Sequence, residues 1–511
     1  MLMGTVLSGL LLVPTQLPPS ASPWPGLLGG PARAPQRHAT DGWLHFEVRD
    51  AATDQPIPAK VTLVGVDGTP DPALTHNDLV RQEGGAILAY NRIMSAMGEG
   101  DVRVPRGTYD VYVSRGIEWD LHVARRVRID DKTAPVQARL RHVVDTAGWV
   151  SADFHVHAAC SYDSQVPMLA RVYEFLADGV DMIVSTDHNV VCDYAPLIAD
   201  LGVGSALTSG TGDEITTVDW GHFGALPLPA DRHRAGHGAV PVHGRTPAEL
   251  FADLRRHHPD ALINVHHARA DPQIGYFTTG QLDAAADRAG RAGFSFDFDA
   301  LEVLNGYQDV ELTQIDRMIH DWFCLLNHGH RVAATGNSDT HHLTYNLGGY
   351  PRNFVRVPDD RPASVTLPQV TRELKAQHAF FTTGPFVRVQ VAGAGMGDLA
   401  HAVGGRAEAL VEVEAAPWIS VSRVIVYLNG RELQRWAVAD TPTPLRMRKR
   451  IPLVVPGDSY FVVRVDGDRS LTPVIGDRAH FDVRPVALTN PVYIDANGDG
   501  VYSAQIPHGP H

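Results

Sequence analysis

Histidine and carboxylate side chains gather in a few short stretches of this sequence. The first stretch, residues 149–164, has the pattern of a short strand that runs into a polar turn. Alternation along a strand places His155 and His157 on the same face. Two neutral imidazoles on one face can bind the same metal ion, and Asp163 follows in the turn. The stretch therefore predicts the first part of a metal site.

Similar side chains recur where later apolar runs end. The runs 182–186, 261–265 and 331–335 are each followed by His, Asp or both, and a polar segment between the first two runs adds further donors. The chain has 26 His, but a chance scatter would not follow the ends of predicted strands. With those of the first stretch, the candidate ligands are His155, His157, Asp163, His188, Glu214, His222, His266 or His267, Asp339 and His341.

This donor set predicts a particular chemistry. Nine nitrogen and oxygen donors exceed the four that one tetrahedral ion takes, so they suit two or three divalent ions that share bridging carboxylates. Clustered ions activate water and hold substrate oxygens, which favours hydrolysis. Mixed His and carboxylate ligands suit zinc, manganese and iron alike.

The elements that must position these donors lie within residues 148–385. Apolar strands alternate there with helical stretches, which predicts an α/β fold with a parallel sheet or barrel. Helices are expected at 167–178, 246–257 and 311–327, the second opening with a Thr-Pro-Ala-Glu capping box. In a barrel of parallel strands the carboxyl ends meet on one face, where catalytic groups collect.

The flanking regions have the alternation of β-strands without a helical period. Residues 41–145 predict a β-sandwich similar to carboxypeptidase-regulatory-like modules, and residues 386–511 predict a second β-sandwich. A length of 511 residues suits about three such domains.

Composition narrows the class of partner. The formal net charge of −14 disfavours nucleic acid, which is bound through Lys and Arg. We therefore expect a small-molecule ester as substrate, neither a nucleic acid partner nor a membrane span, and we leave the oligomeric state open. Residues 1–38 hold a short apolar run, TVLSGLLLV, before a Pro- and Ala-rich stretch. This leader fits either an export signal, with a periplasmic or extracellular protein, or a disordered tail of a cytoplasmic one.

Only three cysteines are present, and no C-x-x-C motif occurs. An odd and sparse set predicts neither a disulfide framework nor a thiolate zinc site. We interpret Cys160 and Cys192 as small buried side chains, with neither a nucleophilic nor a ligand role.

Taken together, the motifs resemble those of the PHP (polymerase and histidinol phosphatase) metallohydrolases over residues 148–385. The resemblance rests on these segments: His155-Val156-His157 with Ser161 and Asp163, Thr186-Asp187-His188, Gly212-Asp213-Glu214, Gly221-His222, and Asn337-Ser338-Asp339-Thr340-His341. Gly148-Trp149, Gly275-Tyr276-Phe277, Glu302-Val303-Leu304-Asn305-Gly306 and Asn490-Pro491-Val492-Tyr493, with the flanking β domains, resemble the carbaryl-hydrolase-like branch (CehA/McbA type).

That resemblance implies an irregular β/α barrel and a role for each motif. His155, His157, Glu214 and Asp339 would hold one ion, and Glu214 would bridge to a second ion on His222 and a His of the third motif. Asp163, His188 and His341 would form a third site. The third motif, His266-His267-Ala268-Arg269, departs from the family's Asn-His-Pro-Arg. Counting from Arg269 selects His267, whereas strand alternation leaves His266 open.

The expected activity is hydrolysis of a phosphoester or of a carboxylic or carbamate ester. We assign catalysis to Glu214, Asp339, His341 and Arg269. The Arg269 guanidinium would hold an anionic substrate oxygen, although an ordinary surface ion pair explains this residue equally well. The alternative function is an exported binding protein with a structural metal centre and β-sandwich binding domains.

Overall fold

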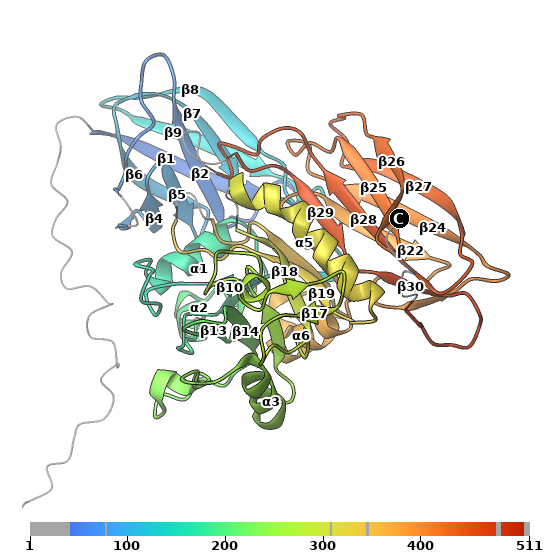
Figure 1. Ribbon diagram of the computed structural model, residues 1–511. Helices are drawn as coiled ribbons and strands as arrows, with labels where there is room; N and C mark the ends of the chain where they lie inside the picture. Colours follow the sequence, from blue (N-terminus) through green and yellow to red (C-terminus); the bar gives the residue numbers. More distant parts are fainter. Residues whose placement is uncertain (1–40, 77–78, 307–308, 344–346, 477–481, 505–511) are drawn as a thin grey trace, which may run out of the picture.

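The computed structural model describes residues 41–504, without 77–78, 307–308, 344–346 and 477–481, and describes only the backbone of 309–313 (Figure 1). The predicted leader, residues 1–38, lies outside the described residues. In Figure 1 the N-terminal and C-terminal β regions lie at opposite ends, and the central region lies below and between them.

The N-terminal region consists of two sheets that share one apolar core. Strand β9 shows why, since every second side chain is buried, from Ala134 to Leu140. The smaller sheet has the order β6-β1-β9 and the larger one the order β3-β4-β5-β2-β7-β8. The bounds are β1 Asp41–Asp50, β2 Ala59–Gly65, β3 Arg81–Glu83, β4 Ala86–Ala89, β5 Arg92–Ser95, β6 Glu99–Pro105, β7 Gly107–Ser114, β8 His122–Ile129 and β9 Thr133–Leu140.

The first central sheet is built around β10. Strands β10, β11 and β12 are parallel and are connected by helices α1 and α2, whereas β20 and β21 continue the sheet in antiparallel fashion on the other side of β10. The bounds are β10 Trp149–Val156, α1 Met168–Ala177, β11 Met182–Ser185, α2 Ala195–Leu201, β12 Thr208–Thr211, β20 Arg352–Arg356, η2 Pro362–Ser364, α6 Leu367–Lys375 and β21 Ala379–Thr382.

The second central sheet has the order β13-β14-β15-β18-β19, antiparallel at first and parallel at the end. The predicted capping box is confirmed at α3, where Glu249 Oε2 accepts from the Thr246 amide at 2.8 Å. The bounds are β13 Asp213–Thr216, β14 His222–Leu226, η1 Ala235–Gly238, α3 Pro247–His257, β15 Leu262–Val265, α4 Tyr276–Thr279, β16 Leu282–Asp283, β17 Arg288–Ala289, β18 Ala300–Asn305, α5 Asp309–Asn327 and β19 Ala333–Asn337.

The C-terminal region shares a sheet with the centre. Strand β21 pairs with β29, so the first central sheet continues through β28, β25 and β26 into an eleven-stranded sheet, on which the sheet β22-β24-β27 packs. The domain boundary expected at residue 385 therefore does not interrupt the backbone hydrogen bonding between strands. The bounds are β22 Phe386–Val391, β23 Leu399–His401, β24 Arg406–Glu414, β25 Arg423–Leu428, β26 Arg431–Ala437, β27 Leu445–Val454, β28 Ser459–Asp466, β29 Val486–Thr489 and β30 Val492–Asp495.

The predicted irregular β/α barrel, and the α/β class with it, is wrong. The described part of the chain is mostly β-sheet, with 39% of its residues in strands and 14% in helices. A β/α barrel needs a ring of parallel strands that alternate with helices. In the described residues, the central strands instead fall into two sheets that contain antiparallel pairs. Strands β13 and β14, for example, follow each other without a helix and pair antiparallel.

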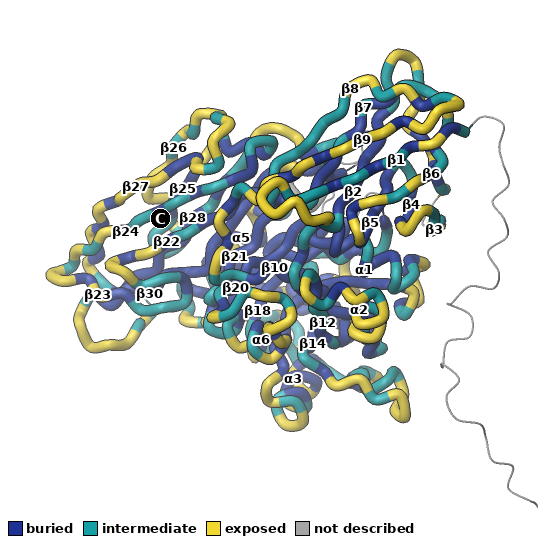
Figure 2. The backbone as a smooth tube through the Cα atoms, turned by 180° about the vertical axis from the view of Figure 1, so that it is seen from behind, coloured by how far each residue is buried: buried dark blue, intermediate teal, exposed yellow. Residues whose placement is uncertain are grey.

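The two central sheets nevertheless meet at the ends of their strands. Isolated backbone bridges join Val156 to Thr340 and His188 to Glu214. Figure 2 shows β10, β18, β20 and β21 as a buried centre, and β10 is buried over all but its first residue. The carboxyl ends of β10, β11, β15 and β19 thereby come close to one another.

A buried ion pair joins the N-terminal region to the centre. The Lys60 ammonium on β2 lies 2.6 and 2.8 Å from the two carboxylate oxygens of Asp178, the residue that follows α1, and both side chains are fully buried. The Tyr350 hydroxyl donates to the same carboxylate at 2.9 Å. No helix in the described part of the chain is both long and apolar enough to span a membrane.

Candidate metal centre

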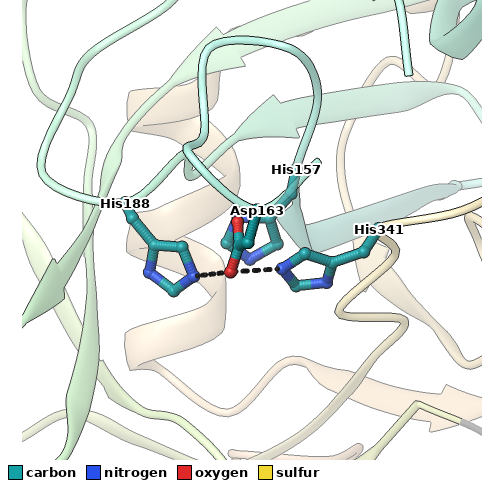
Figure 3. Close-up of side chains that lie close together, drawn as sticks. All are labelled: His157, Asp163, His188 and His341. Carbon is teal, nitrogen blue, oxygen red and sulfur yellow. Dashed lines mark hydrogen bonds and ion pairs between the residues drawn. The ribbon is translucent and has the colours of Figure 1, made fainter. Parts of the chain in front are cut away.

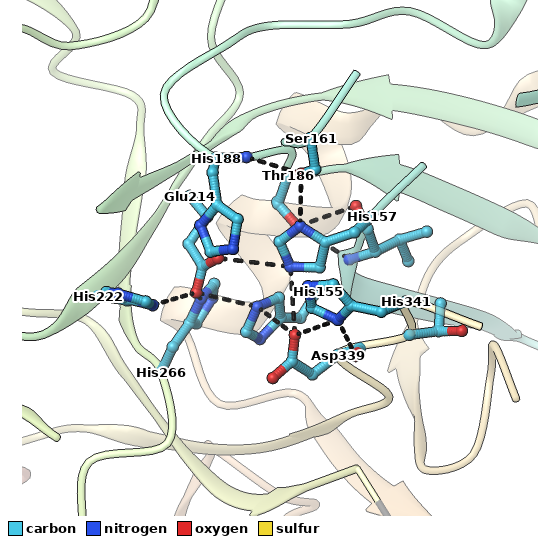
Figure 4. A network of polar contacts seen from close by, with 12 residues as sticks. His155, His157, Ser161, Thr186, His188, Glu214, His222, His266, Asp339 and His341 are labelled. Carbon is cyan, nitrogen blue, oxygen red and sulfur yellow. Dashed lines mark hydrogen bonds and ion pairs between the residues drawn. The ribbon is translucent and has the colours of Figure 1, made fainter. Parts of the chain in front are cut away.

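All of the predicted ligands come together in one place, the donor cluster, which Figure 4 shows in part. Its members come from the end of β10, the loops after β10, β11, β15 and β19, strand β13 and the start of β14. They are His155, His157, Asp163, His188, Glu214, His222, His266, His267, Asp339 and His341.

Glu214 is the centre of the cluster. Its carboxylate is fully buried and lies within 3.4 Å of six imidazole rings, all of which except that of His267 are labelled in Figure 4. Oxygen Oε1 lies 3.0 Å from His155 Nε2, 3.2 Å from His222 Nδ1, 3.0 Å from His266 Nδ1 and 3.3 Å from His267 Nε2. Oxygen Oε2 lies 2.7 Å from His188 Nδ1 and 3.4 Å from His157 Nε2. Such a carboxylate can bridge ions on either side of it.

Asp339 supplies a second shared carboxylate. Its Oδ1 lies 3.1 Å from His155 Nε2 and 3.2 Å from His157 Nε2, so both histidines lie between Asp339 and Glu214. The backbone of Asp339 has a φ of +50°. Asp tolerates this left-handed conformation better than most residues, and the turn brings its side chain back towards the end of β10.

A third group lies at the open side of the cluster (Figure 3). Asp163 Oδ2 lies 2.9 Å from His188 Nε2 and 3.3 Å from His341 Nε2, and His157 completes the group. The Asp163 side chain is 34% exposed, against 0% for Glu214. Solvent therefore reaches the cluster from the side of Asp163.

Hydrogen bonds to one ring nitrogen fix the direction of three imidazoles. Nδ1 of His155 faces Glu302 Oε1 at 3.0 Å, Nδ1 of His157 faces the Ser161 hydroxyl at 2.9 Å, and Nδ1 of His341 faces the Asp339 carbonyl at 2.9 Å. Each Nε2 is left to face the carboxylates of the cluster. Metal-binding histidines are oriented in this way, since the bond to one nitrogen fixes the other as the ligand.

Glu302 was missed as a site residue. It is buried on β18, accepts from the His267 amide at 2.9 Å, and faces His155 Nδ1. The amides of Asn305 and Asn337 also donate to it, at 2.7 and 2.9 Å. The sequence signal was a single carboxylate within the apolar run Ala300–Leu304, where an unpaired charge would be costly.

Several buried polar atoms of the donor cluster lack a hydrogen-bond partner, which indicates that the cluster fits metal ions. Buried polar atoms normally have a hydrogen-bond partner. Four buried atoms that face the centre of this cluster have only ion-pair contacts and no hydrogen bond of good geometry, and a cation bound among them would satisfy them. These are His155 Nε2, His157 Nε2, Glu214 Oε2 and His222 Nδ1.

The structure brings both histidines of the third motif to Glu214. His266 is fully buried and its ring stacks on that of His155, with 3.6 Å between centroids. His267 keeps 13% of its side chain exposed, and its ring lies edge-on to His222 at 4.9 Å. The pairing of His267 with His222 beside Glu214 favours His267 as the ligand of a second ion, with His266 as its packed neighbour.

Arg269 is engaged away from the donor cluster. Its Nε donates to Asp321 on α5 at 2.6 Å, its terminal nitrogen donates to the Leu282 carbonyl at 3.1 Å, and its guanidinium lies over the Phe277 ring. The Arg269 and Asp321 side chains are each only 8% exposed. Arg269 thus forms a buried ion pair, in contrast to the surface ion pair that was the alternative, and its role in holding a substrate oxygen stays a prediction.

Cys160 and Cys192 form a disulfide, which corrects their interpretation as separate buried side chains. The bond joins the loop after β10 to the loop after β11, across 32 residues of sequence. The sequence pattern did not reveal it, since pairing depends on the parallel neighbourhood of β10 and β11.

Charges in the metal-free cluster are strongly coupled. Burial alone would lower the pKa of His188, but the negative charges of Glu214 and Asp163 outweigh it and raise the pKa to about 10. Burial alone would raise the pKa of Glu214, but the surrounding imidazoles, His155 and His188 foremost, hold it well below its usual value. Protons therefore occupy part of this cluster at neutral pH when metal is absent.

We expect metal binding to weaken as the pH falls. Ions must displace the proton that His188 holds up to a pKa of about 10, so binding releases protons. Each proton released lowers the affinity about tenfold for each unit of falling pH. Titration calorimetry in buffers of different ionisation enthalpy would count the protons. An affinity that is unchanged between about pH 8 and about pH 6 would contradict the expectation.

Comparison with known proteins leaves the family open. No protein-family model matches the chain, and no curated protein matches it. Among solved structures, an engineered protein matches with 12% sequence identity and a TM-score of 0.16. The match covers 63% of this chain and 51% of the engineered chain, so it spans about half the length of that structure. Similarity of this degree defines neither fold nor function, and the resemblance to PHP metallohydrolases stays a prediction.

Proposed function

We propose that the protein is a metal-dependent hydrolase that uses two or three divalent ions to activate water against an ester bond. The observation that carries this proposal is the fully buried Glu214 carboxylate among six imidazoles. Closed structural sites take four ligands, whereas this cluster holds ten donors and is open on one side. The motif resemblance to PHP metallohydrolases supports the same reaction class.

Three groups of residues would hold the ions. His155, His157, Glu214 and Asp339 form the first group, Glu214 with His222 and His267 the second, and Asp163, His188 and His341 with His157 the third. When bound, divalent zinc, manganese or iron lowers the pKa of coordinated water and stabilises negative charge on substrate oxygens.

The chain's own groups then orient the substrate and move protons. Asp339 and His341 keep 18% and 19% of their side chains exposed, so with Asp163 they form the face that a substrate meets. Asn305 Nδ2 donates to Asp339 Oδ2 at 3.2 Å and holds this carboxylate in place. Both ring nitrogens of His341 are engaged, so Asp339, through the Oδ2 atom that His155 and His157 do not share, is the group on that face that can accept a proton from the attacking water or deliver one to the leaving group.

We propose a small-molecule ester as substrate, either a phosphoester or a carboxylic or carbamate ester. We also propose that the protein is exported. The Cys160–Cys192 disulfide supports export, because disulfides persist mainly in oxidising compartments.

Parallel assays of aryl phosphate, carboxylic ester and carbamate substrates with added zinc, manganese or iron test the proposal. We expect turnover of one ester class, loss of turnover after chelation, and recovery when metal is restored. Asp339→Ala is expected to abolish turnover, because it removes a carboxylate shared by His155 and His157. Asp131→Ala is the matched control, since the Asp131 side chain is 80% exposed in the N-terminal region. Full activity of metal-stripped protein would refute the proposal, and bound metal without turnover of any ester would favour a binding protein.

A further inference from the structure

The ligands Asp163 and His188 of the third group lie in loops, whereas most ligands of the other groups lie on strands or directly after them. Asp163 lies in the turn between β10 and α1, and His188 lies just beyond the end of β11. The contacts described for the Asp163 carboxylate are to His188 and His341, which are themselves ligands. The turn that carries Asp163 therefore needs support from elsewhere to hold this carboxylate in place.

Hydrogen bonds connect the two loops close to these ligands. The His188 amide donates to the Ser161 hydroxyl at 3.0 Å, and Asp187 Oδ1 accepts from the amides of Ala158 and Ser161 at 2.8 and 3.1 Å. These bonds hold residues that precede Asp163 in the turn, and the Ser164 hydroxyl, which donates to the His341 carbonyl at 3.0 Å, holds the residue that follows it.

The disulfide is the covalent connection between the same loops. Cys160 lies three positions before Asp163, and Cys192 lies four positions after His188. Cys192 is buried with 6% exposure, which anchors this end of the bond in the protein interior. The bond thus limits how far the turn with Asp163 can move away from His188.

We propose that the Cys160–Cys192 disulfide is a positioning device that keeps Asp163 and His188 together for the third ion. This inference rests on the proposed metal centre. Reduction by an external dithiol breaks the S–S bond with two electrons and two protons, gives two thiols, and leaves the dithiol as its own cyclic disulfide. The third ion is then expected to bind more weakly, while the ions on Glu214 stay bound, because strands and buried residues hold their ligands.

Manganese binding to the full-length protein tests the inference. Mn²⁺ prefers oxygen and nitrogen ligands, so the thiols formed by reduction are not expected to bind it. We expect the affinity for the weakest ion to fall about ten- to a hundredfold on reduction, the range for changes to groups that orient ligands. The Cys160→Ser/Cys192→Ser variant should show the same loss without added dithiol. Cys324→Ser is the matched control, since Cys324 is free and lies on α5.

Hydrogen exchange in the metal-free protein gives an independent readout. Amides of residues 158–166 should exchange faster after reduction. This exchange rate does not depend on any bound ion. Unchanged exchange and unchanged manganese affinity, with reduction verified by mass, would overturn this inference alone. An oxidised protein that binds no manganese would overturn the proposed metal centre and this inference together.

Discussion

Replacing Glu214 with glutamine is expected to abolish both metal loading and ester hydrolysis. Glutamine keeps the size of the side chain but loses the negative charge that faces six imidazoles. A bound metal ion contributes several kcal/mol to the stabilisation of charge in the transition state, and this contribution is lost with the ion. At about 1.36 kcal/mol for each factor of ten, the loss is roughly a thousandfold or more in kcat.

The Glu214→Gln experiment has a matched control at Glu302. Glu302→Gln makes the same chemical change at a buried carboxylate that orients His155 and lies outside the Glu214 bridge. We expect this variant to bind its metal ions with lower affinity and to lose activity by about ten- to a hundredfold. Metal content by mass spectrometry, circular dichroism and kcat would be measured on both. Equal metal content and activity in Glu214→Gln and the unaltered protein would argue against a bridging role.

Replacing Lys60 with methionine is expected to destabilise the whole protein. Burial lowers the pKa of Lys60 while the Asp178 carboxylate counteracts it, so the pair is a desolvated ion pair. Methionine would leave the Asp178 charge with only the Tyr350 hydroxyl as a described side-chain partner. Breaking a fully buried pair by removing one partner costs about 3–5 kcal/mol.

Urea unfolding measures the effect of Lys60→Met on the free energy of unfolding. Arg106→Met is the comparison, because its ion pair with Asp131 is exposed, and exposed pairs contribute about 1 kcal/mol or less. A loss for Lys60→Met no larger than that for Arg106→Met would contradict the expectation.

The same pair links the N-terminal region to the donor cluster through α1. Asp178 follows the last residue of α1, and Arg171 on that helix donates to the carbonyls of His157 and Thr340 at 2.8 and 3.1 Å. Those carbonyls belong to the two segments that carry ligands from β10 and from the loop after β19. We therefore expect Lys60→Met to weaken metal binding as well as stability.

The sequence predicted the donors of the candidate site far better than the fold around them. His155, His157 and Asp339 could be placed because an apolar run that ends in polar side chains is a local signal. The pairing of strands is not local, since short apolar runs look alike whether their neighbours are parallel or antiparallel. A parallel barrel was therefore predicted from the runs that could be identified, whereas β13, β14, β20 and β21, which were not predicted individually, form antiparallel pairs.

Long-range pairing also explains the individual misses. Arg269 meets its partner Asp321 across 52 residues, and His155 meets Glu302 across 147. Cys160 and Cys192 come together only because β10 and β11 are parallel neighbours. In each case the residue type was informative, but its partner was defined by the tertiary structure.

The sheet that crosses from the centre into the C-terminal region has a consequence for any attempt to divide the chain. Cutting after Thr382 would strip β29 from β21 and leave the backbone N–H and C=O groups of Phe380, Phe381 and Thr382 without strand partners on that side. An exposed apolar edge of this kind recruits strands from other molecules and drives aggregation. We therefore expect the isolated central region to self-associate, because the C-terminal strands cover this edge in the whole protein.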